Sequence, residues 1–263
     1  MVSIAATPRQ AAKPITIALR ASHRTRGGWS LRYSYLDRVQ RVFGDQHPNP
    51  LLGHWQLDAH LLSAAHALGP GTLTGYAHFI DNQSLPLTSH RNLGLRYALR
   101  RERPAGVGWF ASLEATQQRD YAGGSALVDA HYLLLEGGLL WRGHGFRAGR
   151  ELLSGDGAYG FQTPLATLHA FNGWADKFLV TPVDGLDDRY LAWNRKFGRL
   201  EANVAWHDYR SDHARRDLGR EWNASLGFAP AKHWLLLAKL ADYRAGPGGS
   251  DLRKTWLSLE YTR

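Results

Sequence analysis

The sequence WSLRYSY, residues 29–35, carries the pattern on which the fold depends. Every second residue in it is aromatic or apolar, namely Trp29, Leu31, Tyr33 and Tyr35. The residues between them are serine or arginine. Because successive side chains of an extended chain point to opposite faces, this alternation predicts a β-strand with one apolar and one polar face.

The same alternation recurs along the rest of the chain, for example at 91–101 and 199–210. It predicts about thirteen strands, most of them longer than the five or six residues typical of soluble strands. A strand that spans a bilayer needs roughly 9 to 11 residues. The predicted strands lie near residues 15–24, 28–38, 53–64, 72–81, 91–101, 107–118, 126–136, 139–152, 188–197, 199–210, 220–229, 232–243 and 253–263.

The connections between these strands are alternately short and long. The short ones are RTRG, ALGPG, RERPAG, Gly137-Gly138, Gly198 and Pro230-Ala231. The long ones cover residues 39–52, 82–90, 118–125, 154–187, 211–219 and 244–252. Outer-membrane barrels have short periplasmic turns at one rim and long external loops at the other. The pattern therefore predicts one all-β domain over residues 1–263, a transmembrane antiparallel up-and-down β-barrel.

The tryptophans favour the same arrangement. Trp29, Trp109, Trp141 and Trp234 fall at the short-turn ends of their strands, whereas Trp55 and Trp222 fall near the long-loop ends. Indole rings at both ends are typical of the two aromatic girdles at the membrane interfaces. The alternative is a soluble all-β carbohydrate-binding barrel whose core holds these rings.

The composition sets further limits. The sequence has no cysteine, which excludes disulfides and thiolate metal sites. It has no apolar run of the roughly 20 residues that a membrane-spanning helix needs. Residues 1–14 also hold no apolar stretch of signal-peptide length. The net charge of +9 indicates an anionic partner, and without a basic helix or an RNA-binding signature it does not point to nucleic acid.

The segment 154–187 is the one long stretch without strand alternation. Its Phe, Leu and Trp content argues against disorder and predicts an ordered external loop that constricts the lumen. Phe161, Leu165, Phe171 and Trp174 would anchor this loop. The residues expected to face a permeant are Gln162, His169, Asn172, Asp176 and Lys177.

Part of this segment resembles a known family. FQTPLATLHAFNGWADKF at 161–178, followed by Asp188-Arg189-Tyr190, is similar to the signature of alginate-export-type outer-membrane barrels, as are residues 149–152 and 155–157. The resemblance implies a porin of the Gram-negative outer membrane that passes an anionic polysaccharide or oligosaccharide such as alginate. It also implies contact with outer-membrane lipid, lipopolysaccharide and the barrel-assembly machinery.

Two features depart from this family. The sequence ends in Arg263, whereas such barrels usually end in an aromatic residue. An odd number of strands also places the start of the first strand outside the cell, although barrels of this kind have even strand numbers. We therefore expect that an N-terminal portion with a signal peptide is missing, and a nonfunctional barrel fragment is a further alternative.

The parity of the strands also predicts the lining of a pore. Arg32, Arg96, Arg100, Arg147 and Lys239 fall on the polar faces, away from lipid. Guanidinium groups bind carboxylates through two parallel hydrogen bonds, which suits uronate sugars. The alternative is that these cations pair across the lumen with Asp58, Glu114, Glu201 and Glu260 and only stabilise it.

Catalysis has little support in the sequence. It contains no HExxH motif, nucleophile elbow or P-loop, so no catalytic residue and no cofactor is predicted. Asp184, Asp187 and Asp188 have oxygen ligands of the kind that Ca²⁺ prefers, but their spacing alone does not predict a metal site.

Overall fold

The structure is a computed structural model that describes residues 16–25, 27–41, 47–102, 106–165 and 172–262. Its strands are β1 (Thr16–Arg24), β2 (Ser30–Gln40), β3 (His54–Leu68), β4 (Gly71–Asn82), β5 (His90–Arg101), β6 (Val107–Asp120), β7 (Asp129–Trp141), β8 (His144–Leu153), β9 (Leu186–Phe197), β10 (Leu200–Arg210), β11 (Asp217–Phe228), β12 (Trp234–Ala245) and β13 (Leu252–Tyr261). The helical elements are α1 (Pro50–Gly53), η1 (Pro86–Thr88) and η2 (His213–Arg215).

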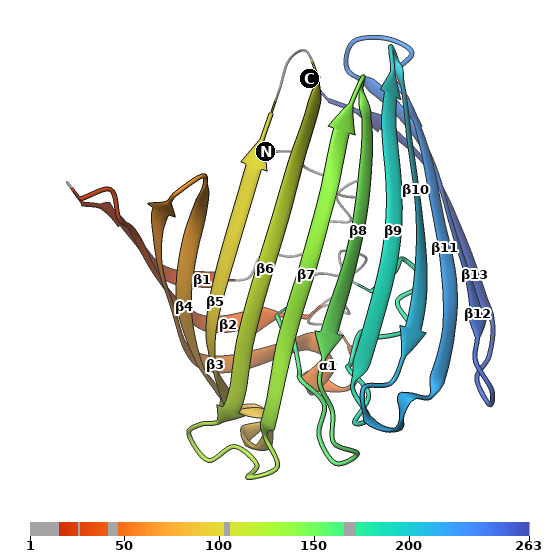
Figure 1. Ribbon diagram of the computed structural model, residues 1–263. Helices are drawn as coiled ribbons and strands as arrows, with labels where there is room; N and C mark the ends of the chain where they lie inside the picture. Colours follow the sequence, from red (N-terminus) through yellow and green to blue (C-terminus); the bar gives the residue numbers. More distant parts are fainter. Residues whose placement is uncertain (1–15, 26, 42–46, 103–105, 166–171, 263) are drawn as a thin grey trace. The chain divides into compact units, whose positions relative to one another are not determined.

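The strands form a 13-stranded sheet in which each strand lies beside its neighbours in sequence (Figure 1). The pairings described are antiparallel, for example β3 with β4 and β9 with β10. This confirms the predicted all-β, up-and-down arrangement. No helix in the described part of the chain has the length and apolar character needed to cross a bilayer.

The chain divides into two compact units, which we describe separately. We call Arg100–Ser112 together with Leu134–Arg263 the C-terminal unit. We call Arg9–Leu99 together with Leu113–Leu133 the N-terminal unit. Strands β6 and β7 contribute residues to both.

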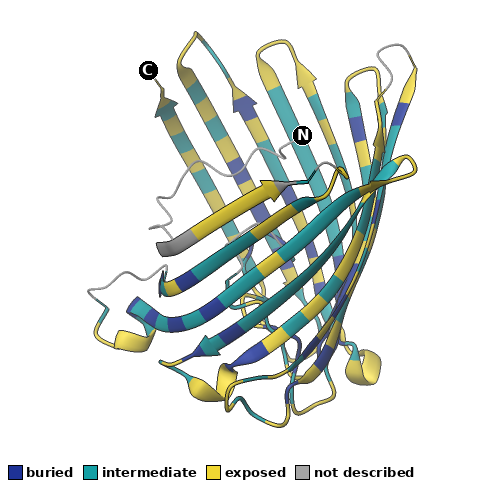
Figure 2. Ribbon diagram, turned by 90° about the vertical axis from the view of Figure 1, so that its left-hand side faces the viewer, coloured by how far each residue is buried: buried dark blue, intermediate teal, exposed yellow. Residues whose placement is uncertain are grey.

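The two faces of the strands differ in polarity. Along the strands in Figure 2, exposed positions alternate with less exposed ones. Leu93 and Leu95 of β5, and Leu257 and Leu259 of β13, are exposed. The fully buried side chains include polar ones, such as Glu221, which is 0% exposed. We call the side that carries these leucines the apolar face and the other side the polar face.

The predicted turn at Gly137-Gly138 is wrong. Both glycines lie inside β7, and the turn falls at Arg142 and Gly143, whose φ angles are 48° and 80°. Two successive positive φ angles are typical of a type I′ hairpin turn. A Cβ on Gly138 would meet the ring of Phe110 and the carbonyl oxygen of Phe146. Gly138 is thus required by close packing, which local sequence does not distinguish from a turn.

The close contact at Gly138 leads to a first prediction. Gly138→Ala should lower the free energy of unfolding by about 1–3 kcal/mol, because the ring and the strand backbone must move to admit the methyl group. The measurement is urea unfolding of the refolded chain in detergent micelles, followed by tryptophan fluorescence.

The neighbouring Gly137→Ala is the matched control, since the nearest atom to its Cβ is the Phe110 carbonyl oxygen at 3.6 Å, an ordinary contact. Equal stability of the two variants would contradict the packing role of Gly138.

Candidate functional site

The loop between β8 and β9 lies against the polar face of the C-terminal unit. Its residues Asn172–Phe178, which we call the docked segment, are held by backbone hydrogen bonds. The backbone N–H of Trp174 donates to Asn223 Oδ1 at 3.1 Å, and that of Ala175 donates to Glu221 Oε1 at 2.8 Å. The hydroxyl of Tyr209 donates to the carbonyl oxygen of Asn172 at 3.0 Å. The loop is therefore ordered here, as its composition predicts.

Three carboxylates lie beneath the docked segment, on Glu151, Asp188 and Glu221. Asn172 Nδ2 donates to Glu151 Oε2 at 3.0 Å and lies 3.4 Å from Asp188 Oδ2. His207 Nδ1 lies 3.0 Å from both oxygens of Asp188. Buried carboxylates need hydrogen-bond donors. The Asn172 amide of the loop and the His207 imidazole of β10 both lie within hydrogen-bonding distance of these carboxylates.

Gly173 allows the docked segment to approach these groups. Its φ of 87° lies in the left-handed region, and a Cβ there would meet the Tyr209 hydroxyl and the Glu221 carboxylate. Any other residue would be strained by its backbone conformation and would displace the buried side chains. The conformation and the close packing at position 173 thus explain why HAFNG ends in glycine.

Aromatic rings and lysines fix the rest of the segment. Lys239 Nζ lies 4.3 Å from the ring centroid of Trp174 and 5.1 Å from that of Trp256. Lys254 Nζ lies 2.8 Å from Asp176 Oδ2. Lys177 is exposed, with its Nζ 3.4 Å from the Ser250 carbonyl oxygen.

The base of the loop is closed by its own backbone. The N–H of Phe161 donates to the Ser154 carbonyl at 2.8 Å, and Gln162 Nε2 donates to the Gly160 and Thr181 carbonyls at 2.8 and 3.0 Å. Asp156 accepts two hydrogen bonds from the N–H groups of Tyr159 and Ala158, which lower the pKa of its carboxyl. Burial raises the pKa of Tyr159 to about 12.

Two of the predicted arginines belong to a motif that occurs twice. In the N-terminal unit, the ring of Tyr76 lies over Gly94, and its hydroxyl donates to Glu114, which also pairs with Arg96 at 3.0 Å. In the C-terminal unit the corresponding residues are Tyr190, Gly149, Glu136 and Arg147, with a hydroxyl to carboxylate distance of 2.6 Å and an ion pair of 3.3 Å. Each arginine is thus positioned by a carboxylate.

The other predicted lining residues differ in their contacts. Arg32 lies in register with Ser22 and Ser63 on the polar face, and Arg100 Nε pairs with Glu102 at 2.7 Å. Asn172, Asp176 and Gln162 contact the polar face or the loop itself, as described above. His169 and the predicted anchor Phe171 lie outside the described residues.

The predicted girdle tryptophans fall into two groups. Trp29, Trp141, Trp222 and Trp234 are exposed, and Trp109 is half-buried. Trp55 differs from the expectation because it is buried, at 9% exposure. Its Nε1 donates to the Leu51 carbonyl at 2.8 Å, and the Arg41 guanidinium lies 3.9 Å from its ring. An apolar residue next to a long loop can therefore pack beneath the loop and not against lipid.

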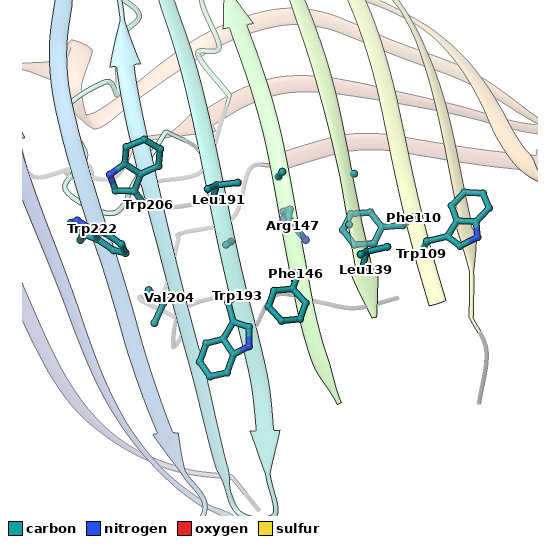
Figure 3. A pocket seen from close by; sticks show the side chains of 14 residues that line it. Trp109, Phe110, Leu139, Phe146, Arg147, Leu191, Trp193, Val204, Trp206 and Trp222 are labelled. Atoms are coloured by element: carbon teal, nitrogen blue, oxygen red, sulfur yellow. The ribbon is translucent and has the colours of Figure 1, made fainter. Parts of the chain in front are cut away.

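A shallow groove on the apolar face gathers further aromatic rings (Figure 3). Its lining includes Trp109, Leu139, Phe146, Leu191, Trp193, Val204, Trp206 and Trp222. Trp206 and Trp222 are cross-strand partners of β10 and β11. Trp193 and Trp206 were not among the predicted interface residues, although the alternation of β9 and β10 places them on this face.

The three aspartates considered as Ca²⁺ ligands have different partners. The carboxylate of Asp187 accepts hydrogen bonds from Nε and Nη2 of Arg150, at 2.7 and 2.9 Å. Asp184 forms an ion pair with Arg216 at 3.2 Å. Asp188 points to the polar face, where it meets His207. Among the described residues no cluster of three or more metal-ligating side chains is found.

The fold is similar to that of solved outer-membrane porins. OccK3 (OpdO) of Pseudomonas aeruginosa shares 19% identity with a TM-score of 0.67, over 92% of this chain and 67% of that one. OccAB4 of Acinetobacter baumannii shares 14% with a TM-score of 0.71, over 93% and 64%. The structure of P. aeruginosa OpdK with vanillate shares 15% with a TM-score of 0.69, over 92% and 66%.

The chain spans about two thirds of the length of these proteins. No family model and no curated protein matches the sequence. The comparisons therefore establish a porin-type fold and do not support the predicted resemblance to alginate-export-type barrels.

The docked segment leads to a second prediction. Gly173→Ala should release the segment from the polar face, because the added methyl group collides with Tyr209 and Glu221. Trypsin should then cleave after Lys177 several times faster than in the unchanged chain, as measured by limited proteolysis in micelles.

Gly248→Ala is the matched control. Gly248 has a similar φ of 82°, but no atom lies within 4 Å of its Cβ, so this variant carries the backbone strain without the collision. If both variants were cleaved equally fast, docking would not depend on the space at Gly173.

Proposed function

We propose that the chain forms a channel of the outer membrane that passes small organic anions. The observation that carries this proposal is the placement of polarity, with an exposed apolar face and a polar face that holds buried carboxylates and a docked loop. A bilayer solvates the first face, and a water-filled lumen would suit the second. The likeness to outer-membrane porins supports the same conclusion.

The arginines of the polar face support an anionic solute. Arg96 and Arg147 are each positioned by a glutamate that also accepts a tyrosine hydroxyl. A guanidinium has five N–H donors, so one carboxylate partner leaves donors that a solute carboxylate can use. One of the similar channels was solved with vanillate, an aromatic carboxylate. We infer that monocarboxylates of this size are the primary solutes.

An acidic oligosaccharide carries the same carboxylate groups on a larger molecule. Each uronate of an alginate fragment carries one carboxylate, which a guanidinium group such as that of Arg96 or Arg147 would bind through paired N–H donors. The docked segment takes up space on the polar face and would favour short oligomers over long polymers.

The arginines lead to a third prediction. Arg96→Gln/Arg147→Gln should lower the anion to cation permeability ratio about twofold or more, because two fixed positive charges leave the lumen wall. The measurement is the reversal potential across planar bilayers under a KCl gradient. Arg142→Gln, at an exposed turn, is the control and should leave the ratio unchanged. A cation-selective channel in the unchanged chain would overturn the anionic solute.

The loop leads to a fourth prediction. Replacing residues 158–178 with a short Gly-Ser linker should raise single-channel conductance about twofold, because the docked segment no longer narrows the path. Replacing residues 247–249 of the β12–β13 connection with a Gly-Ser linker is the control and should have little effect. Unchanged conductance after the first replacement would mean that the segment lies outside the path of ions.

A further inference from the structure

Eight arginines gather around one end of the strands β8 to β13. They are Arg150, Arg189, Arg210, Arg215, Arg216, Arg220, Arg244 and Arg253. We call this set the arginine belt. Its members lie where the strands meet the three long connections 154–185, 211–216 and 246–251. In an outer-membrane barrel, long connections lie at the external rim.

The register places the strand members of the belt on the apolar face. Arg150 pairs with Arg189, and two positions further along Ala148 pairs with the exposed Leu191. On the next strands Arg220 lies two residues from the exposed Trp222, so both side chains point to the same side. The belt is therefore distinct from the arginines of the polar face.

Four of the five carboxylates that form ion pairs with the belt are less exposed than its guanidinium groups, and the exception is Asp251, at 55%. Side chains of the eight arginines are 42% to 68% exposed, whereas Asp187 is 0%, Asp208 11% and Asp242 25% exposed. Asp187 accepts from Arg150, Arg189 and Arg215. Recessed carboxylates fix the guanidinium planes and leave positive charge outermost.

The belt also has an excess of positive charge. Its eight guanidinium groups face six carboxylates, the five ion-pair partners Asp184, Asp187, Asp208, Asp242 and Asp251 and that of Asp212, whose charge acts on Arg150. Such an excess at a membrane surface attracts anionic lipid headgroups. A second copy of this chain is disfavoured as the occupant, because it would present the same charge.

One end of the aromatic groove, formed by Trp206, Trp222 and Leu191, lies beside the belt, whereas the other end reaches the short-turn ends of β6, β7 and β8. Trp222 follows Arg220 by two residues and Trp206 precedes Asp208 by two, and Figure 3 shows these two indoles on neighbouring strands. Leu191 likewise follows Arg189 by two residues. Cationic donors at the rim and apolar rings towards the middle of the strands together match an amphipathic molecule with phosphate at one end and acyl chains at the other.

We propose that this surface binds one phosphorylated, acylated glycolipid of the outer leaflet, of the lipid A type. Its phosphates contact the arginine belt through paired N–H donors, and its acyl chains contact the end of the groove formed by Trp206, Trp222 and Leu191. The inference rests on the proposed function only in that it places the chain in an outer membrane. It does not require that any solute passes.

The test uses the full chain refolded in neutral-detergent micelles. The variant is Arg220→Gln/Arg253→Gln, which leaves Asp208 paired with Arg210 and Asp242 paired with Arg244, so neither recessed carboxylate loses its last partner. Arg142→Gln/Lys232→Gln removes the same charge from the exposed short turns at the opposite ends of the strands. The shift of each protein in gel mobility on heating checks that it has folded.

The probe is purified lipid A with two phosphates, titrated and counted by native mass spectrometry. We expect the belt variant to bind about tenfold more weakly than the unchanged chain, and the turn variant to bind equally well. Lipid A without its phosphates should bind the unchanged chain as weakly as intact lipid A binds the belt variant. Trp222→Ala should weaken binding of the intact lipid about threefold, because part of the acyl contact is lost.

Several results would overturn the proposal. One is equal binding by the belt variant and the unchanged chain, and another is equal loss in the turn variant. Displacement of the lipid by inorganic phosphate at equal concentration would assign the belt to free phosphate. Binding is measured in micelles and does not depend on conductance. Lipid binding without conductance would therefore contradict only the proposed channel. Conductance without lipid binding would contradict only the glycolipid site.

Discussion

The alternation of side chains along each strand is the constraint on which the rest of this structure depends. A shift of one residue would exchange the two faces, placing Arg96 and Glu114 among the leucines and Leu93 and Leu95 among polar groups. The packing supports the register at particular points, because the rings of Tyr76 and Tyr190 occupy the space that a Cβ on Gly94 or Gly149 would need. Each tyrosine then places the glutamate that positions an arginine. The faces, the register and the proposed solute contacts therefore have one cause.

The docked segment depends on that polar face in a way that local sequence cannot express. Glu151, Asp188 and Glu221 are costly to bury, and their donors come from β10 and from a loop about fifty residues away from Glu221 in sequence. In turn, the backbone N–H groups of Trp174 and Ala175 donate to Asn223 and Glu221. Each side stabilises the other, so the position of the docked segment is a property of the pair and not of the loop alone.

The same distinction explains what the sequence predicts and what it does not. Alternation is local, so all thirteen strands were found, with ends displaced most at β7 and β8. Glycine was ambiguous, because Gly138 makes room for Phe110 whereas Gly143 makes a turn. The buried role of Trp55 follows from Leu51 and Arg41, which approach it from the loop side. His207 and Asn223 lie on the polar face by parity, but their partners, Asp188 and the backbone of Trp174, could not be named without the fold.

Arginine has two different settings in this protein, and the setting determines what it can recognise. On the polar face, Arg96 and Arg147 each pair with one glutamate, which suits reversible contact with a passing carboxylate. On the apolar face, the arginine belt outnumbers its recessed aspartates and adjoins aromatic rings, which suits lasting contact with a phosphorylated lipid. Arginines of this protein thus serve two different surfaces. A solute that passes must be released, whereas a lipid that anchors need not be.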